Sequence, residues 1–358
     1  MAILVAGLGY IGAALTHRLL DRGDDVVAVE NFFSTPREAV TSLTAHARLS
    51  LVEGSVADED TWERAFGAET IDRVFYLAGQ ASAHPSAGPI AYTQETNYRG
   101  PRLLIEACRR SQVQSLVCAS STRLYRTPLP RLVSEQSPLH ATDLVHLSQL
   151  YGEILLTTYA AADRNSSREV TPVSMVAARL GIVHGLGPVM KYSPVFLAVP
   201  QRFCQQAAAG ELLRASTGPH SFLPFVHISD AVDGLITCLD LPPGVHIVNV
   251  AAEARSVADV ARVVQEAGQA RGLHVEVEYA GPRRPYAERR VTSRLAGYGF
   301  AATRTLEGSL AEVLDYYLAR SALEPAAGSN PIEPAISTLT GALAQPGDSD
   351  GARERPGT

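Results

Sequence analysis

The sequence is poor in lysine and cysteine and has no long apolar run. Of its 31 lysine and arginine residues only Lys191 is a lysine, and the formal net charge is −6. Because nucleic-acid binding needs a basic surface, this balance argues against a nucleic-acid partner. No apolar run approaches the ~18 residues of a membrane span, which argues against a membrane protein.

The four cysteines are Cys108, Cys118, Cys204 and Cys238, and their spacing fits no metal motif. Such scattered cysteines are typical of a reducing compartment rather than of a disulfide framework. Residues 1–15 are apolar but lack the basic start of a secretory signal. We therefore expect a cytoplasmic protein without a bound metal.

The sequence does contain a regular alternation of short apolar runs and helical patterns, with 46% hydrophobic residues. Strands are predicted at residues 2–6, 25–30, 48–53, 73–78, 115–119, 172–179, 225–228 and 245–250, and helices at 10–22, 59–66, 90–111, 141–161 and 256–270. Alternating strands and helices favour a parallel sheet covered on both faces. The predicted fold class is α/β, a Rossmann-like doubly wound parallel sheet with a smaller C-terminal substrate domain.

A glycine-rich turn follows the first predicted strand. Residues 7–12 read Gly-Leu-Gly-Tyr-Ile-Gly, the spacing of a dinucleotide-binding turn between a strand and a helix. Gly7 allows the tight turn, Gly9 lets the backbone approach a pyrophosphate, and Gly12 lets helix and strand pack closely. The free N–H groups and the dipole of the following helix attract the anion.

An acid, Glu30, ends the second predicted strand, where a dinucleotide presents its ribose 2′-hydroxyl. A carboxylate would repel a 2′-phosphate, so Glu30 favours NAD over NADP. Arg37 is the one nearby group that favours NADP. The sequence therefore predicts NAD as the cofactor.

With these features the sequence resembles the NAD-dependent epimerase/dehydratase family of extended short-chain dehydrogenase/reductases, typified by UDP-glucose 4-epimerases. The resemblance runs from Ile3 to about Tyr317. It includes the strand-four turn at residues 77–79, the strand-five motif at 120–125, and later segments at 225–230 and 248–250.

The resemblance implies a set of site residues. Those for the cofactor are Gly7, Gly9, Tyr10, Ile11, Gly12, Glu30, Asn31, Leu77, Ala78, Gly79, Asn97 and Gln149. It also implies that Ser121 and Thr122 contact a nucleotide-sugar substrate, with Ser121 hydrogen-bonded to the carbinol. Arg284 is the implied contact to the nucleotide-sugar phosphate.

One family feature is missing: no Tyr-x-x-x-Lys pair occurs anywhere in the sequence. Aligned on Ser148 and Glu153, Val145 takes the tyrosine position and Gln149 the lysine position. In the family the lysine favours the phenolate, so that a phenol of pKa ~10 exchanges protons near neutrality. Valine has no such proton, and glutamine can only hydrogen-bond a ribose hydroxyl.

Other groups are candidates for the proton transfer. Ser121 and His84 are the predicted catalytic residues. Ser121 takes the position of the family residue that bonds the carbinol, and His84 lies in the loop after strand four, on the side that faces the cofactor. His146 adjoins Val145 but should point about 100° away on the helix, and His184 falls where the family has a tyrosine. Packing or surface roles are the alternatives for each histidine.

The predicted domains are a Rossmann domain over residues 1–178 and about 225–250, and a substrate domain over 179–224 and 251–320. Residues 321–358 are rich in proline, glycine, serine and acids, which predicts a disordered tail. The resemblance implies a homodimer through the predicted helices at 90–111 and 141–161.

Three functions stay open. The chain is an NAD-dependent nucleotide-sugar epimerase or reductase with a non-standard acid–base group, a non-catalytic NAD(H)-binding sensor or scaffold, or a non-redox lyase or isomerase on the same fold. The first accounts for the complete cofactor turn, and the second for Val145 and Gln149.

Overall fold

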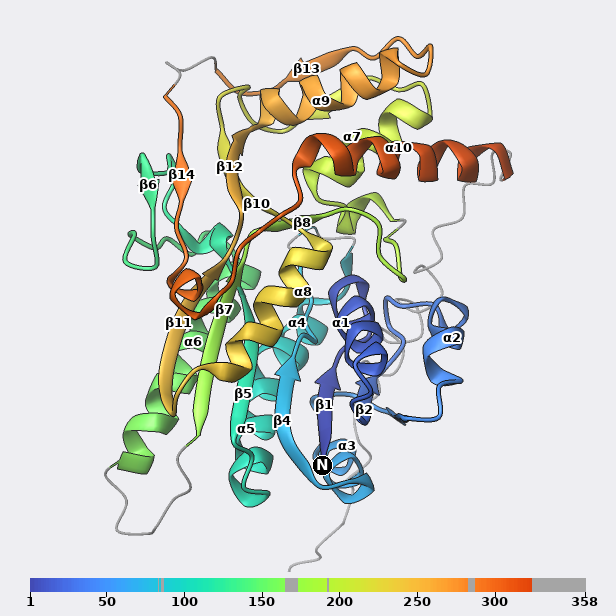
Figure 1. Cartoon of the computed structure of the whole chain (residues 1–358). Helices are drawn as coiled ribbons and strands as arrows, with labels where there is room; N and C mark the ends of the chain where they lie inside the picture. The colour runs from blue at the N-terminus through green and yellow to red at the C-terminus, as the bar shows by residue number, and fades with distance from the viewer. Residues whose placement is uncertain (83, 85–86, 165–172, 192, 283–286, 324–358) are drawn as a thin grey trace, which may run out of the picture.

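A computed structural model describes residues 1–82, 84, 87–164, 173–191, 193–282 and 287–323 (Figure 1). Its centre is a seven-stranded sheet in the order β11-β7-β5-β4-β1-β2-β3, with every neighbouring pair parallel. The strands are β1 (Ala2–Ala6), β2 (Val26–Glu30), β3 (Leu49–Glu53), β4 (Ile71–Tyr76), β5 (Ser115–Ser121), β7 (Ser174–Leu180) and β11 (Gly244–Val250). This order reverses direction between β1 and β4, where a doubly wound sheet opens a crevice at its carboxyl edge.

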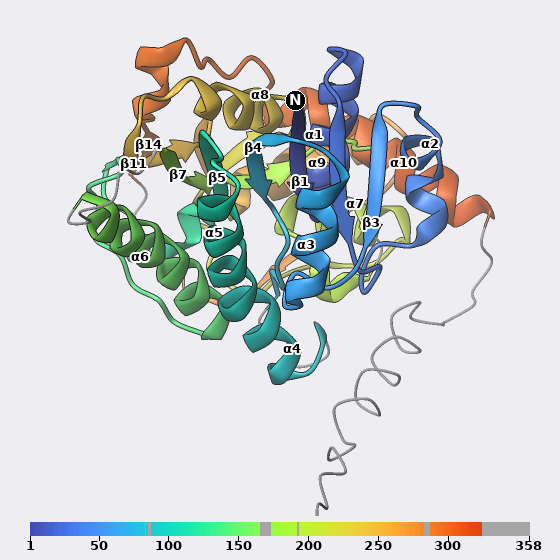
Figure 2. The same ribbon diagram turned by 90° about the horizontal axis from the view of Figure 1, so that it is seen from below.

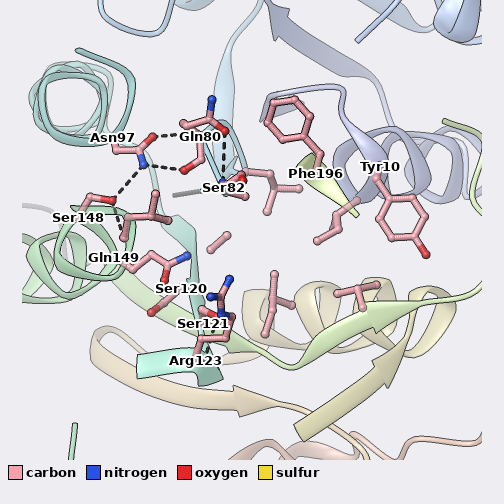
Figure 3. A pocket seen from close by; sticks show the side chains of 18 of the residues that line it. Tyr10, Gln80, Ser82, Asn97, Ser120, Ser121, Arg123, Ser148, Gln149 and Phe196 are labelled. Atoms are coloured by element: carbon pink, nitrogen blue, oxygen red, sulfur yellow. Dashed lines mark hydrogen bonds between the residues drawn. The ribbon is translucent and has the colours of Figure 1, made fainter. Parts of the chain in front are cut away.

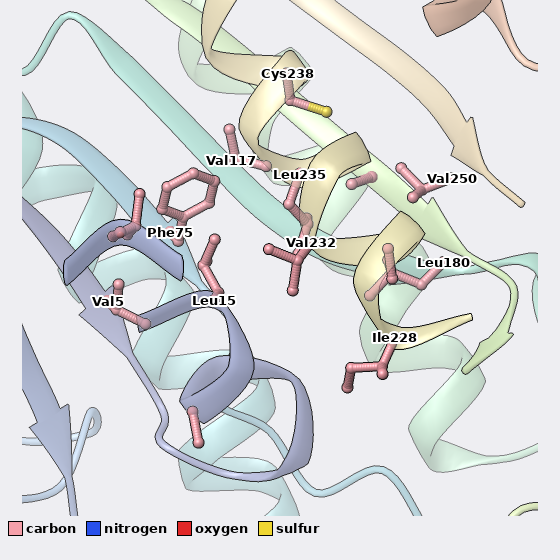
Figure 4. Close-up of a cluster of buried hydrophobic side chains, with 14 of the residues drawn as sticks. Val5, Leu15, Phe75, Val117, Leu180, Ile228, Val232, Leu235, Cys238 and Val250 are labelled. Carbon is pink, nitrogen blue, oxygen red and sulfur yellow. The ribbon is translucent and has the colours of Figure 1, made fainter. Parts of the chain in front are cut away.

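Helices cover both faces of the sheet, as predicted (Figure 2). The helices are α1 (Tyr10–Asp21) and α8 (Ile228–Thr237) on one face, and α3 (Glu59–Ala68), α5 (Gly100–Arg110) and α6 (Leu144–Arg164) on the other. Successive strand residues point to opposite faces, so Val5 and Phe75 join the α1–α8 core (Figure 4) and their neighbours Leu4 and Val74 join the other. Burying each such side chain stabilises the fold by about 1.5–3 kcal/mol.

A smaller part lies above the carboxyl edge of the sheet (Figure 1). It contains a three-stranded sheet of β12 (Glu253–Ser256), β10 (Phe222–His227) and β8 (Ile182–His184), and the pair β9 (Leu213–Ala215) and β13 (Val277–Tyr279). Helices α7 (Val199–Ala208), α9 (Val257–Gln269) and α10 (Leu306–Leu323) enclose its own core, which includes Phe203, Val260 and Leu310.

Two predicted boundaries are corrected. The strand predicted near residue 225 is β10, which pairs with β8 and β12 rather than with the central sheet, so the chain rejoins the Rossmann part at Ile228. Helix α10 continues to Leu323, past the predicted start of the tail at residue 321. Alanine and leucine at the end of this segment favour helix, and the change in composition comes only after them. Residues 324–358 lie outside the described part.

The predicted helix at 90–111 is interrupted. It consists of α4 (Ile90–Gln94), a π-helical turn η3 (Glu95–Arg99) and α5. Pro101 lies in the first turn of α5 and has no backbone N–H to donate, which favours a wider turn before it. The turn carries Asn97 toward the end of β4.

The remaining elements are short: α2 (Thr41–Thr44), β6 (Leu132–Val133) and β14 (Arg290–Val291). Within the described ranges, none of the helices combines the length and the apolar character that crossing a membrane requires. All four cysteines are free and buried.

Candidate active site

Three adjoining cavities follow the carboxyl edge of the sheet. A small cavity of about 80 Å³ lies at Glu30, a middle cavity of about 460 Å³ lies between Tyr10 and Phe33, and a large cavity of about 550 Å³ reaches Ser121. Leu77 and Gly79 line all three, so the cavities adjoin one another, and together they are called the groove.

The three glycines of the turn have different reasons to be glycine. Gly7 has a φ of +94°, and a Cβ on it would lie 2.8 Å from the backbone nitrogen of Ala78. A Cβ on Gly12 would collide with the carbonyl oxygen of Gly7, so this glycine lets the helix pack on the turn itself. On Gly9 the nearest atom would be Thr35 Oγ1 at 3.9 Å. The fold requires Gly7 and Gly12, whereas Gly9 keeps space open beside the groove.

Glu30 fixes the glycine turn to the end of β2. Its carboxylate accepts backbone N–H groups from Leu8 at 2.6 Å, Phe32 at 2.8 Å and Asn31 at 2.9 Å. Burial raises the pKa of Glu30, while these three donors act to lower it. The Asn31 amide donates to the hydroxyl of Tyr92 at 3.1 Å. Glu30, Asn31 and Tyr92 all line the small cavity.

Arg37, the group that favours NADP, is held by an acid. Its guanidinium is paired with Glu53 at the end of β3 and lies 4.1 Å from the centre of the Phe32 ring. The carboxylate lowers the availability of this cation for a 2′-phosphate, because any phosphate would have to displace it.

Tyr10, at the start of α1, lines the middle and large cavities. Its hydroxyl donates to the carbonyl of Gly185 at 2.7 Å and accepts from Gln201 at 3.3 Å. The ring thereby joins the glycine turn to the smaller part of the molecule. Ile11 lines the same two cavities.

Asn97 clamps the turn after β4 to helix α6 (Figure 3). Its side chain accepts from the backbone N–H of Gln80 at 2.8 Å and donates to Gln80 O and to Ser148 Oγ, both at 3.0 Å. Leu77, Ala78 and this turn line the groove. The structure thus gives Asn97 a positioning contact as well as a place in the wall.

The end of β5 lines the large cavity with the consecutive residues Ser120 and Ser121. Ser121 and Arg123 line it, whereas Thr122 is buried and donates its hydroxyl to the carbonyl of Leu180 at 3.2 Å. The prediction that Thr122 contacts substrate is therefore not supported, because at the start of the short turn η4 (Thr122–Leu124) its side chain is buried against Leu180. The Ser121 hydroxyl accepts the backbone N–H of Arg123 at 3.1 Å.

Helix α6 places Val145, Ser148 and Gln149 in the wall of the large cavity. Val145 is 4% exposed, and Gln149 lies one turn further on, in the spacing expected from the alignment. Gln149 points into the cavity (Figure 3), and its Oε1 is buried with no hydrogen-bond partner in the described structure.

His146 also lines the large cavity, contrary to the expected direction of its side chain. Its Nδ1 lies 2.8 Å from Thr142 Oγ1 and 3.1 Å from Asp143 Oδ2, and no described residue bonds its buried Nε2. Burial and the charge of Arg123 lower the pKa of His146, against the opposing effect of Asp143. The family resemblance gave no signal for this, but Asp143, an acid three residues before His146 at the start of a helix, would have been one.

The other two histidines differ. His84 lines the large cavity and is exposed. His184 is buried away from the cavity, with Nδ1 2.8 Å from Ser309 Oγ, and burial lowers its pKa to about 3. A group that stays neutral and enclosed in this way fits a packing role. Arg284 lies outside the described residues.

Sequence reasoning missed two cations of the groove, Lys191 and Arg202. Lys191 lines the middle and large cavities with its ammonium 5.9 Å from the centre of the Tyr10 ring, and burial lowers its pKa. Arg202, on α7, lines the large cavity and its buried Nε has no described partner. The rarity of lysine was the only sequence signal, because the segment before α7 has no periodic pattern.

A buried polar network supports the floor of the site. Ser120 donates to Glu153 at 2.6 Å, and Arg179 binds both oxygens of Glu153 at 2.8 and 2.7 Å. Arg179 also reaches the hydroxyl of Tyr125 at 3.1 Å, which donates to Asn249 at 2.5 Å. Arg179 and Glu153 neutralise each other within this network. The network therefore joins β5, α6, β7 and β11 but leaves neither charge available to a ligand. No cluster of three potential metal ligands occurs among the described residues.

Comparison with known proteins agrees with this geometry. The UDP-glucose 4-epimerase of Erwinia amylovora is 32% identical over 169 residues, 46% of this chain and 50% of that protein. The UDP-N-acetyl-alpha-D-glucosaminuronate decarboxylase of Bacillus cytotoxicus is 24% identical over 284 residues, 78% of this chain and 84% of that protein. The chain spans about half the length of the UDP-glucose 4-epimerases that it matches.

The fold has solved counterparts as well. The crystal structure of the Bifidobacterium longum UDP-glucose 4-epimerase in complex with NAD+ and UDP has a TM-score of 0.74 at 22% identity, covering 91% of this chain and 99% of that one. The model of the family described as "NAD dependent epimerase/dehydratase family" matches residues 3–251. The Rossmann sheet, the glycine turn and this match agree, and the chain belongs to the NAD-dependent epimerase/dehydratase family.

Proposed function

We propose that the chain binds NAD and a nucleotide sugar and acts as an epimerase or reductase of that sugar with a non-standard acid–base group. The observation that carries the proposal is the groove that runs from Glu30 past the glycine turn to Ser121. The small cavity at Glu30 suits an adenosine, and the middle cavity suits a pyrophosphate. The large cavity has Ser121 to hydrogen-bond an alcohol and has room for a second ligand.

The residues of the groove fit a dinucleotide. Glu30 is positioned to accept ribose hydroxyls, and the space beside Gly9 admits the pyrophosphate next to the start of α1, which has no side-chain cap. Gln149 Oε1, which lacks a partner, suits a hydroxyl of the nicotinamide ribose. Bound NAD supplies the acceptor for a hydride from the carbinol carbon of the sugar.

The proton of the carbinol needs an acceptor other than a tyrosine. Ser121 orients the hydroxyl, and His146 receives its proton on Nε2, since Asp143 and Thr142 hold Nδ1. A neutral imidazole with a lowered pKa is in its basic form at neutral pH. His84, which also lines the large cavity, is the alternative acceptor.

The proposal is tested by measuring NAD affinity by calorimetry and turnover of UDP-hexoses and UDP-uronates. Ser121→Ala, His146→Gln and His84→Ala each separate one role. We expect His146→Gln to lower kcat by ~10²–10⁴-fold and to remove the acidic limb of the pH profile while NAD affinity is kept. Wild-type protein that binds NAD but converts none of these sugars would contradict the enzymatic part.

A second candidate function is a non-catalytic NAD(H)-binding sensor or scaffold. It is favoured by Val145, a non-titratable side chain in the wall beside Ser121. Loss of a measurable turnover on replacing Ser121 or His84 would eliminate it.

A further inference from the structure

The large cavity is positively charged in a protein that is acidic as a whole. Its described walls carry Arg123, Lys191 and Arg202 but no aspartate or glutamate, although the chain has a net charge of −6. Elsewhere the arginines are commonly paired with acids, as Arg179 is with Glu153. Lys191 and Arg202 are partly buried, and cations left unmatched there indicate that the ligand supplies the anions, whereas Arg123 is a solvent-exposed cation on the same cavity wall.

The three cations lie at different places along the groove. Lys191 lies in the wall shared with the middle cavity, beside Tyr10 and the glycine turn. Arg202 comes from α7 in the smaller part. Arg123 follows Ser121 directly at the end of β5, where the carbinol is bound in the proposed function. Phosphates of the ligands therefore have Lys191 and Arg202, and Arg123 serves another group.

Arg123 is presented to the cavity by a fixed backbone. Ser121 accepts its N–H, and the next residues form the short turn η4 (Thr122–Leu124). The guanidinium points into the cavity (Figure 3), and no hydrogen bond or ion pair holds it within the described residues. The side chain of Gln149 points into the same space, and its Oε1 is buried without a described partner.

The pKa of His146 responds to the charge of Arg123. Its imidazole lines the cavity, with Asp143 against Nδ1 from the start of α6 and Arg123 acting from η4. Burial and then the charge of Arg123 lower the pKa of His146, and Asp143 opposes both effects. An anion bound to Arg123 would reverse the effect of that arginine.

We propose that Arg123 binds a carboxylate on the sugar, so that the substrate is a nucleotide-linked uronic acid rather than a neutral hexose. The planar guanidinium donates two parallel N–H groups to a carboxylate, a match that the hydroxymethyl group of a hexose lacks. This inference rests on the proposed function, since it places the sugar beside Ser121.

The test compares affinities in the presence of NAD. Calorimetry with UDP-glucuronate, UDP-glucose and UDP is carried out on the wild type, on Arg123→Gln and Arg123→Lys, and on Arg126→Gln. Arg126 is an exposed arginine three positions on that does not line the cavity, so Arg126→Gln is the matched control.

We expect the wild type to bind UDP-glucuronate at least about tenfold more tightly than UDP-glucose. Arg123→Gln should weaken the binding of UDP-glucuronate by about ten- to a hundredfold and change the affinity for UDP-glucose and UDP by no more than about twofold. The control Arg126→Gln should change the affinity for all three ligands by no more than about twofold. Arg123→Lys should restore part of the preference, because it keeps the charge and loses the fork.

A second measurement does not depend on affinity. The imidazole of His146, assigned in NMR spectra with His146→Gln, should show a higher pKa with UDP-glucuronate bound than with UDP-glucose bound. Equal affinity for the two sugars, or an equal loss for UDP in Arg123→Gln, overturns the uronate assignment while the proposed function stands. Wild-type protein that binds neither NAD nor UDP overturns the proposed function, and the inference with it.

Discussion

The two ends of the groove differ in how their polar groups are engaged. At the nucleotide end the carboxylate of Glu30 already accepts three backbone N–H groups, and Asn31 is bonded to Tyr92. At the other end Gln149 Oε1 and His146 Nε2 are buried without described partners. Arg123 faces the same cavity.

This difference separates what the fold requires from what a ligand requires. Buried polar groups are nearly always hydrogen-bonded, so a cluster of unpartnered ones points to a ligand that completes them. Among the described residues, Thr96 Oγ1 is such an atom in the wall of the small cavity, whereas Gln149 Oε1, His146 Nε2 and Arg202 Nε are such atoms in the wall of the large one. In the proposed function the substrate completes the groups of the large cavity. Changes at the first should alter binding of the shared cofactor, and changes at the second should alter which substrate is chosen.

The largest effect is expected from Gly9→Val. Gly9 has an extended backbone, and a Cβ there meets no protein atom within 3.4 Å, so the fold should tolerate a side chain. The same side chain fills the space beside the groove, and NAD affinity should fall by about a hundredfold or more, ~2.7 kcal/mol. Calorimetry measures the loss, and thermal unfolding should show a Tm within a few degrees of wild type.

Gly7→Ala is the contrasting variant. The φ of +94° and the contact with Ala78 should destabilise the fold by ~1–3 kcal/mol. If Gly9→Val unfolds the protein as much as Gly7→Ala does, the distinction between the two glycines is wrong.

The next effect concerns the lost pair at the sugar end. Val145→Tyr combined with Gln149→Lys adds a phenol and an ammonium one turn apart in the wall of the cavity. If the rest of the pocket suits the sugar, turnover of a UDP-hexose or UDP-uronate should rise, by a general acid–base contribution of ~10²-fold or more. Steady-state kinetics with each sugar measure this rise in turnover.

Each single variant is the control, because either group alone lacks its partner. A double variant that is folded and binds NAD, yet converts no sugar, would show that the substrate side also differs from that of the epimerases.

A smaller effect is expected from Asn97→Leu, which breaks the clamp between the two ends. It removes three hydrogen bonds to Gln80 and Ser148, and each contributes about 0.5–1.5 kcal/mol. We expect a lower Tm and a lower kcat/KM. Ser148→Ala loses one bond to Asn97 and one to the carbonyl of Val145, so it should have a smaller effect than Asn97→Leu; an equal effect would argue against a clamp centred on Asn97.

The smallest effect on the groove is expected from the outer face of α6. Leu147 and Ile154 are 50% and 56% exposed and lie seven residues apart, so they share one face. The predicted homodimer would bury them. Leu147→Glu with Ile154→Glu should convert a dimer to a monomer in light scattering while ligand affinity stays within about twofold. A wild-type monomer would make the dimer prediction wrong.

The sequence predicted the central sheet well and the smaller part poorly. Strands β1 and β2 lie where the apolar runs placed them, because buried parallel strands read as continuous apolar segments. β10 was assigned to the wrong sheet, since a short apolar run carries no information about its partner strand. The interruption at Pro101 was missed because its neighbours keep a helical pattern.

The residues of the site were also predicted well in one part and poorly in another. Residues joined by local spacing, Gly7 to Gly12 and then Glu30, were found from the sequence and line the nucleotide end, apart from details of packing. Thr122 was assigned to the substrate although it faces the interior, and His146 was expected to face away although it lines the cavity. Alternation along a chain gives relative directions, and only the packing of neighbouring elements fixes which direction is inward.

By itself the sequence determined the fold class, the glycine turn, the expectation of NAD and the absence of a Tyr-x-x-x-Lys pair. These depend on local geometry and on residue identity, which a sequence states directly. Only the tertiary structure brought Arg123, Lys191, Arg202 and His146 into the wall of one cavity, whose described lining contains no acid. These residues come from different elements far apart in the chain, and their electrostatic coupling exists only once the folded chain has excluded water from between them.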